Sequence, residues 1–166
     1  KGFYKIPLGQ SKIVKKGKDI TIVGFSYLLV EAIHAAKFLE IYGIKCEIID
    51  IRTIKPLDLI PIIKSVKKTK QLIVLDSGYS SFGISNEIIT QVVSKCFNVL
   101  QKPPIKLSMP DVPEPSSPAL TKNFYIRASD IVDSVSKLLN LKKTKFKKIK
   151  DPIVHDVPGE WFKGPF

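Results

Sequence analysis

The chain has 166 residues, which suits one domain with a real core and is too short for two domains of ordinary size. Its composition, 44% hydrophobic and 25% charged, is close to the globular average and excludes wholesale disorder. A formal net charge of +12 would attract nucleic acid or an acidic partner, but the lysines are scattered and no nucleic-acid motif accompanies them, so the sequence favours a lysine-rich solvated surface and no nucleic-acid partner.

Other features of the sequence indicate where the protein works. No apolar run approaches membrane-spanning length and residues 1–18 contain no signal-peptide core, so we expect a soluble protein with no membrane partner. Cys46 and Cys96 have no metal-ligand spacing, which favours buried, reduced thiols and an intracellular protein. Met109 is the only methionine, so we expect the natural N-terminus to lie further upstream.

The first predicted elements are two strands. Residues 1–10 contain Pro and Gly without a helical period and should form an extended lead-in. Strands are predicted at 11–14 and 19–25, joined by a tight turn in which Gly17 would supply a positive φ. The first strand is expected to be antiparallel at the sheet edge, where its lysines oppose edge-to-edge pairing.

A strand, a helix and a second strand come next. After Ser26, a good N-cap residue, apolar side chains recur with a helical period until Gly43 ends the helix, and a further apolar run occupies 48–51. Two short strands flanking a crossover helix pair in parallel with a right-handed connection. The helix face consists of Leu29, Ala32, Ile33, Ala36 and Leu39.

The same alternation continues to residue 139. Strands are predicted at 71–75 and 105–108, a Pro-rich irregular loop after the second of them, and a last helix from Ser129 or Asp130. Two more helices have apolar faces made of Leu59, Ile62, Ile63 and Val66, and of Ile84, Ile88, Val92 and Cys96. The sequence therefore predicts an α/β fold: a three-layer α/β/α domain with a mainly parallel five-stranded sheet and one antiparallel edge strand.

Candidate contact residues follow the strands. In open α/β sheets, ligands bind beyond the carboxyl ends of the strands, so the polar loop DSGYSSFGISNEI is the best placed segment. Arg52, two residues after Asp50, could pair at the sheet end, bind an acidic group or face a partner. The loop candidates are Asp76, Gly78, Tyr79, Phe82 and Gly83.

The sequence assembles no catalytic, cofactor or metal site. His34 lies within a predicted helix, and adjacent His155 and Asp156 do not by themselves form a site. After the basic residues 142–150, Trp161 and Phe162 are large apolar groups that should dock onto this domain or onto a partner.

The segment GKDITIVGFSYLLVEAIHAAKFLEIYGIKCEIIDIRTIKPLD resembles the start of the transketolase C-terminal domain. With IPLGQSKI ahead of it and DIRTIKPLD within it, the chain looks like the β subunit of the decarboxylating component of 2-oxo acid dehydrogenase complexes, of pyruvate or branched-chain type. The resemblance covers about residues 6–139. The family's loop reads acidic-Glu-Gly-aromatic-x-x-Phe-Gly, and this chain matches it except at Ser77, which stands where an acidic residue is frequent.

The resemblance implies an oxidoreductase of a multienzyme complex, with this part as its C-terminal domain. Residues 1–10 would lead in from a missing preceding domain, 11–140 would form the domain, and 141–166 a basic and then aromatic tail. Thiamine diphosphate and Mg²⁺ would be bound by domains absent here, with none bound by this chain alone, so it would not be catalytic alone. Its expected partners are an own-type subunit in a dimer, a cofactor-binding α subunit or domain, and the lipoyl acyltransferase core, in the cytoplasm or a eukaryotic organellar matrix.

Two alternatives remain. The same domain occurs in transketolases and deoxyxylulose-phosphate synthases, whose substrates are sugar phosphates. A stand-alone basic binding module would instead use the lysine-rich surface and the aromatic tail to hold an acidic protein or nucleic acid.

Overall fold

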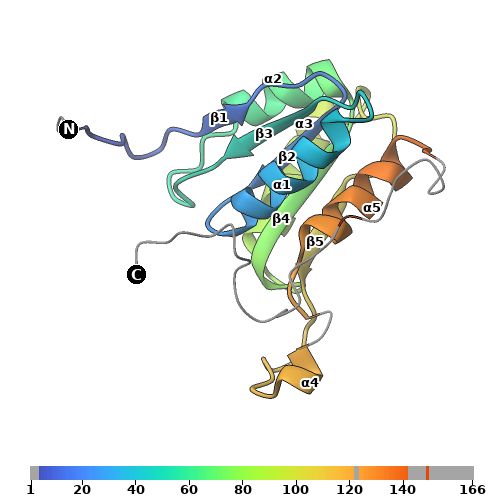
Figure 1. The fold of residues 1–166 in the computed structure, drawn as a ribbon. Helices are drawn as coiled ribbons and strands as arrows, with labels where there is room; N and C mark the ends of the chain where they lie inside the picture. Colours follow the sequence, from blue (N-terminus) through green and yellow to red (C-terminus); the bar gives the residue numbers. More distant parts are fainter. Residues whose placement is uncertain (1–3, 122–123, 142–148, 150–166) are drawn as a thin grey trace.

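The computed structural model describes residues 4–121, 124–141 and 149, and its centre is a five-stranded sheet (Figure 1). The strand order is β1-β3-β2-β4-β5. β1 lies antiparallel to β3 at one edge, and the other neighbours pair in parallel. The strands are β1 (Lys12–Lys15), β2 (Ile20–Gly24), β3 (Cys46–Asp50), β4 (Leu72–Tyr79) and β5 (Ile105–Met109).

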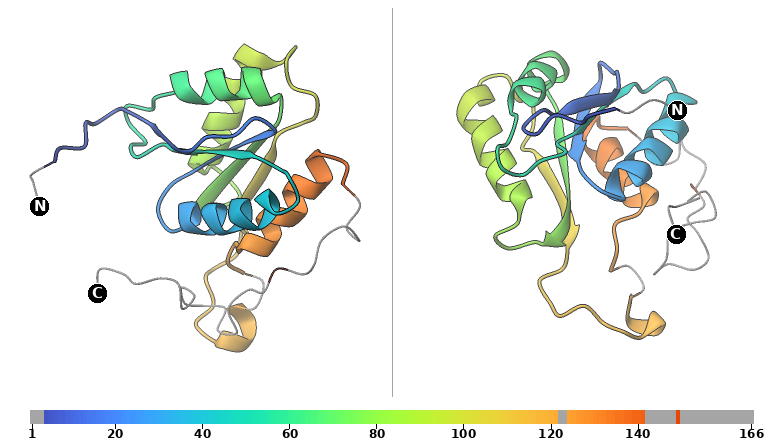
Figure 2. Two further views of the ribbon diagram at one scale, coloured as in Figure 1. Left: turned by 45° about the horizontal axis from the view of Figure 1, so that its top comes forward. Right: turned by 90° about the vertical axis from the view of Figure 1, so that its left-hand side faces the viewer.

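Two pairs of helices cover the two faces of the sheet, as the right-hand view of Figure 2 shows. α1 (Leu28–Glu40) and α5 (Ala128–Leu138) pack on one face around a core that includes Ile22 and Ile48. α2 (Ile60–Thr69) and α3 (Ile84–Cys96) cover the other face, where Val74 belongs to the core. The predicted three-layer α/β/α fold with one antiparallel edge strand is therefore confirmed.

The segment between β5 and α5 forms an arm that projects from the body of the protein and carries the single-turn helix α4 (Pro118–Thr121) (Figure 1). The chain returns to the core through Phe124 and Ile126, both buried. Next to this return, Arg127 Nη1 lies 3.3 Å from Glu31 Oε1 of α1, and the backbone N–H of Ala128 donates to Glu31 Oε2 at 2.8 Å. A buried ion pair thus fixes the start of α5 on α1.

Two predicted details of local geometry are wrong. Gly17 does not have a positive φ; it is needed because a Cβ there would lie 2.2 Å from the carbonyl carbon of Cys46, where the β1–β2 turn crosses β3. Ser26 does not cap α1, because the residue in the N-cap position is Tyr27 and Ser26 has a φ of 56°.

Most strand boundaries differ from the predicted ones by one or two residues, and two differences have an evident structural cause. β4 continues past the predicted end at residue 75 to Tyr79, because β5 still pairs with it there. α5 begins at Ala128, one residue before the predicted start, and the side chain of Asp130 accepts a hydrogen bond of 2.8 Å from the Arg127 N–H, which satisfies one backbone donor at the start of the helix.

Both cysteines are buried free thiols. Burial raises the pKa of the Cys46 thiol to about 12, so this group stays protonated and unreactive near neutral pH. We therefore expect iodoacetamide at pH 8 to leave Cys46 unmodified in the folded chain and to alkylate it in urea, as followed by mass spectrometry. Rapid alkylation without unfolding would contradict the buried placement.

Candidate protein-interaction site

The site begins with a buried carboxylate at the carboxyl edge of the sheet, where parallel strands β2 to β5 all end. Asp76 is only 2% exposed, and its two carboxylate oxygens accept hydrogen bonds of 2.9 Å from the backbone N–H groups of Gly78 and Ser85. The Asp76 side chain thereby joins the last residues of β4 to the first turn of α3. A negative charge is favourable at this end of α3 because of the helix dipole.

The same carboxylate leaves no room for a side chain at Gly83 and little room at Gly78. A Cβ at Gly83 would lie 2.4 Å from Asp76 Oδ2, and one at Gly78 would lie 3.2 Å from Asp76 Oδ1. The structure therefore brings Asp76, Gly78 and Gly83 together as one structural unit. Its effect is to fold the intervening residues 79–82 outward.

The loop is also tied to β5 and to the segment that follows it. Lys106 Nζ donates to Asn86 Oδ1 at 2.8 Å and to the carbonyl oxygen of Ser80. The hydroxyl of Ser81 donates to Asp111 Oδ2. With Asp76 on one side and these contacts on the other, the loop is held in a defined conformation.

The aromatic residues of the loop point to solvent. Phe82 is fully exposed, with a relative accessibility of 102%, and Tyr79 is 44% exposed. Phe82 adopts a φ of 57°, in the left-handed region that bulky side chains rarely occupy. A large apolar side chain is thus presented to solvent in a strained backbone conformation.

The carboxyl edge contains two more residues of this kind. Ser26 follows β2 with a φ of 56°, and Arg52 follows β3 with a φ of 57°. The other two such non-glycine residues of the described chain, Lys70 and Asn140, follow helix ends, where a left-handed residue is ordinary. Backbone strain outside helix ends is therefore concentrated at the carboxyl edge, a distribution typical of functional sites.

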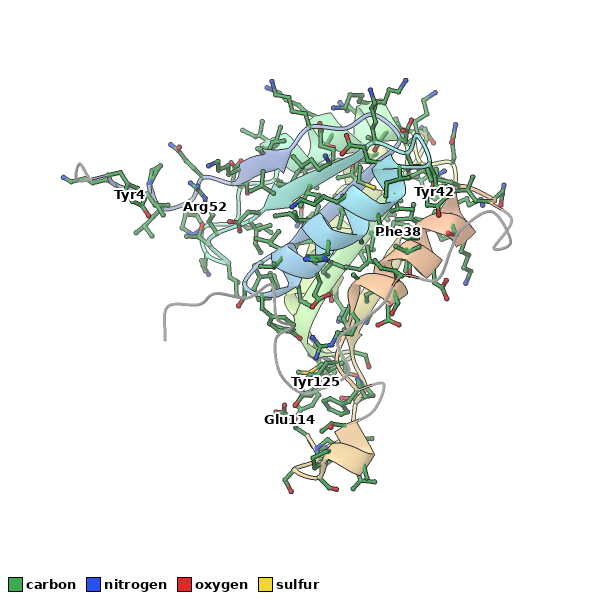
Figure 3. All side chains as sticks on the ribbon, viewed as in Figure 1. Tyr4, Phe38, Tyr42, Arg52, Glu114 and Tyr125 are labelled. Atoms are coloured by element: carbon green, nitrogen blue, oxygen red, sulfur yellow. The ribbon has the colours of Figure 1, made fainter. Side chains whose placement is uncertain are left out.

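Arg52 pairs with its neighbour Asp50. Its Nε lies 3.9 Å from Asp50 Oδ2, and its backbone N–H donates to Asp50 Oδ1 at 3.0 Å. Figure 3 places Arg52 beside the N-terminal lead-in that contains Tyr4, well separated from Tyr125 and Glu114 of the arm. The ion pair between Arg52 and Asp50 is long, and both side chains are partly exposed. Arg52 can therefore pair with Asp50 and still face a partner.

Other exposed apolar residues at this edge were missed by sequence reasoning. Ile54 follows β3 and is 55% exposed, and Val112 follows β5 and is 53% exposed. Their exposure could have been inferred from the sequence, because Ile54 and Val112 each lie between polar or proline residues just after a strand. With Tyr79 and Phe82, they are exposed apolar residues that belong to or follow three different strands along this edge, β3, β4 and β5. The remaining candidates, Trp161 and Phe162, lie outside the described residues.

Neither a metal-binding cluster nor a membrane-spanning helix is found in the part of the chain that the structure describes. Within residues 4–121, 124–141 and 149, no three His, Cys, Asp or Glu side chains gather into a group that could hold a metal ion. The same part of the chain contains no helix that is long and apolar enough to cross a membrane. The charged groups at the edge, such as Asp76 and Lys106, are used to shape the loop.

Comparisons with known proteins match most of the chain. The family described as "Transketolase, C-terminal domain" matches residues 9–131. The chain is 39% identical over 132 residues to the "Pyruvate dehydrogenase E1 component subunit beta" of Rhizobium meliloti, covering 80% of this chain and 29% of the relative. It is 41% identical over 133 residues to the protein of the same name from Rickettsia felis, covering 80% and 41%.

A mitochondrial relative and a solved structure also match most of this chain. The "Pyruvate dehydrogenase E1 component subunit beta, mitochondrial" of Mus musculus is 36% identical over 139 residues, covering 83% of this chain and 39% of the relative. A solved structure titled "Split gene transketolase, inactive beta4 tetramer" superimposes with a TM-score of 0.70 at 29% identity, covering 84% of this chain and 45% of the other. The chain spans less than half the length of each of these proteins.

Proposed function

Because the chain belongs to the family of transketolase C-terminal domains, we propose that it serves as the subunit-interaction domain of a 2-oxo acid dehydrogenase β subunit of pyruvate type. Its role there is dimerisation with a second copy and docking to the lipoyl acyltransferase core. The proposal is supported by relatives named pyruvate dehydrogenase E1 component subunit beta, which share 34 to 41% of the matched residues.

The single observation that carries the proposal is the presentation of Phe82. A fully exposed phenylalanine normally has few packing contacts to fix its position. Phe82 is nevertheless held in a left-handed backbone conformation by a loop that is anchored on Asp76. Aromatic residues in pre-organised positions dominate the binding energy of protein interfaces, because little conformational entropy is lost when they are covered. We therefore place the dimer contact at the carboxyl edge, with Phe82 as its anchor.

The reaction of the whole protein requires groups from other parts of it. The relatives' names imply a thiamine-diphosphate-dependent dehydrogenase, in which the cofactor supplies the electron sink for decarboxylation of a 2-oxo acid. We assign the cofactor to a preceding domain and an α subunit, and no chemical step to this chain.

The proposed arrangement of the whole protein follows from the same premise. Residues 1–10 would continue from the preceding domain, 11–140 would form the interaction domain, and 141–166 would extend beyond it. Relatives occur in bacteria and in mitochondria, so the cytoplasm and the mitochondrial matrix are the compartments we propose.

Phe82→Ala tests the proposal. We expect the variant to weaken self-association of the chain about thirtyfold, since truncating an aromatic hot spot removes roughly 2 kcal/mol or more of binding free energy. Sedimentation equilibrium over a range of concentrations measures the dissociation constant directly. Thermal unfolding of the monomer, measured below the dissociation constant, should be almost unchanged, because Phe82 contacts solvent in the isolated chain.

The matched control is Phe97→Ala. Phe97 is 74% exposed but follows α3 at the opposite end of the helix from the loop, so its removal should leave the dissociation constant within about twofold. Equal losses in the two variants, or a wild-type chain that stays monomeric at every concentration, would overturn the proposed dimer contact.

A further inference from the structure

A second surface lies in a groove between β1 and α2, and β3 and β2 separate it from β4 and the Phe82 loop. These two elements run side by side in Figures 1 and 2, and the space between them has a volume of about 490 Å³. Ile13 of β1 and Ile60 and Pro61 of α2 form its apolar part. Lys16, Lys64 and Lys68 form its charged part.

The base of the groove is built around a buried carboxylate. Glu47 of β3 has a side chain only 3% exposed, and its Oε2 accepts hydrogen bonds from Lys68 Nζ at 2.6 Å and from the Gly17 N–H at 3.2 Å. It therefore joins α2, the β1–β2 turn and β3 at one point. Gly17 also approaches the backbone of Cys46 too closely for any side chain, so the turn packs directly on β3 at the base of the groove.

Glu47 neutralises only one of the three lysines. Burial raises the pKa of its carboxyl, but the hydrogen bonds from Lys68, Ser65 and Gly17 lower that pKa more, so Glu47 is ionised at neutral pH. Lys68 is its partner. Within the part of the chain that the structure describes, Lys16 and Lys64 have no acidic partner, so the groove retains positive charge that the protein does not compensate.

The apolar residues determine which anionic partner fits. Ile60 is 64% exposed and Ile13 is 40% exposed, so an occupant would remove substantial apolar surface from water. No aromatic residue belongs to the described lining of the groove, so it lacks the stacking platform that single-stranded nucleic acids use. An apolar centre with a charged rim is instead the common anatomy of a protein interface.

We propose that this groove binds an acidic amphipathic segment of a partner protein, in which apolar side chains alternate with Asp or Glu. The apolar side chains cover Ile13, Ile60 and Pro61, and the carboxylates pair with Lys16 and Lys64. Since β3 and β2 lie between this groove and the Phe82 loop, a subunit paired through Phe82 can still engage a partner here.

The test uses the complete 166-residue chain and a short fluorescein-labelled peptide of alternating Glu and Leu, with binding followed by fluorescence anisotropy. We expect saturable binding that Lys64→Glu weakens about tenfold or more, because a reversed charge repels the carboxylates. Ile60→Gln should weaken binding to a similar extent by removing the apolar contact. A peptide of alternating Gln and Leu should not bind measurably.

Matched controls separate the groove from the overall charge. Lys37→Glu makes the same charge change on α1, across the sheet, and Ile41→Gln alters an isoleucine just after α1 that is 78% exposed, somewhat more than Ile60; neither should change binding more than about twofold. Equal losses for Lys37→Glu and Lys64→Glu would show attraction to net charge alone and overturn the proposal. Displacement of the peptide by a single-stranded oligonucleotide that binds more tightly would assign the groove to nucleic acid instead. The Phe82→Ala measurement is independent of all these outcomes.

Discussion

Arg127→Ala is expected to lower the free energy of unfolding by about 3 to 5 kcal/mol, because it leaves the carboxylate of Glu31 buried without its guanidinium. Glu31 is 2% exposed, and Arg127 lies 3.3 Å away with a side chain that is itself mostly buried. The hydrogen bond from the Ala128 N–H remains but cannot neutralise the charge. Urea unfolding at equilibrium, followed by circular dichroism, measures the change.

Two further variants make this result specific. Lys15→Ala removes an ion pair of 2.9 Å with Glu40 that lies at the surface, and it should change the stability far less. The double replacement Arg127→Met with Glu31→Leu should recover much of the loss, since an apolar pair needs no partner charge. A loss of less than about 1 kcal/mol for Arg127→Ala would contradict the assignment of this pair as a buried anchor.

Asp76→Ala is expected to lower the free energy of unfolding by about 3 kcal/mol, since two hydrogen bonds to a charged acceptor are lost at once. The N–H groups of Gly78 and Ser85 would then lose their acceptor, and the loop that holds Phe82 would lose its anchor. Self-association should therefore weaken as much as in Phe82→Ala. Urea unfolding and sedimentation equilibrium on the same preparation measure the two effects.

Asp111→Ala is the control for this loop. Asp111 is exposed and accepts only the hydroxyl of Ser81 among the described contacts, so its loss should change the stability by less than about 0.5 kcal/mol. If Asp76→Ala destabilises the chain but leaves self-association unchanged, the loop is structural and the dimer contact lies elsewhere.

The fold could be predicted from the sequence because its signals are local. The apolar runs at β2, β3 and β4 and the helical periods between them specify an alternating α/β order, and parallel pairing with right-handed crossovers follows from that order. The position of the 76–83 loop was predictable for the same reason, because it follows a strand. Its role in binding stays a prediction until the variants above are measured.

The details of the site depend on tertiary contacts and could not be predicted. Nothing local indicates that Ser26 and Arg52 adopt left-handed backbones, since both conformations arise where a strand must turn immediately into a loop. The pairing of Glu31 with Arg127 joins residues 96 positions apart. From the sequence, Gly17 is expected to supply a positive φ in a turn. Only the structure, in which this turn crosses β3, shows that glycine is needed because a Cβ would collide with the backbone of Cys46.

The position of α5 has a consequence for how the chain folds during synthesis. α5 is the last helix of the described domain, yet it packs on α1, the first helix of that domain, and together they complete one of the two cores. While the ribosome is still making the arm, this face of the sheet is covered by α1 alone, whereas α2 and α3 have already closed the opposite face. The nascent chain therefore passes through a half-covered intermediate whose apolar face is a substrate for chaperones until residues 128–138 emerge.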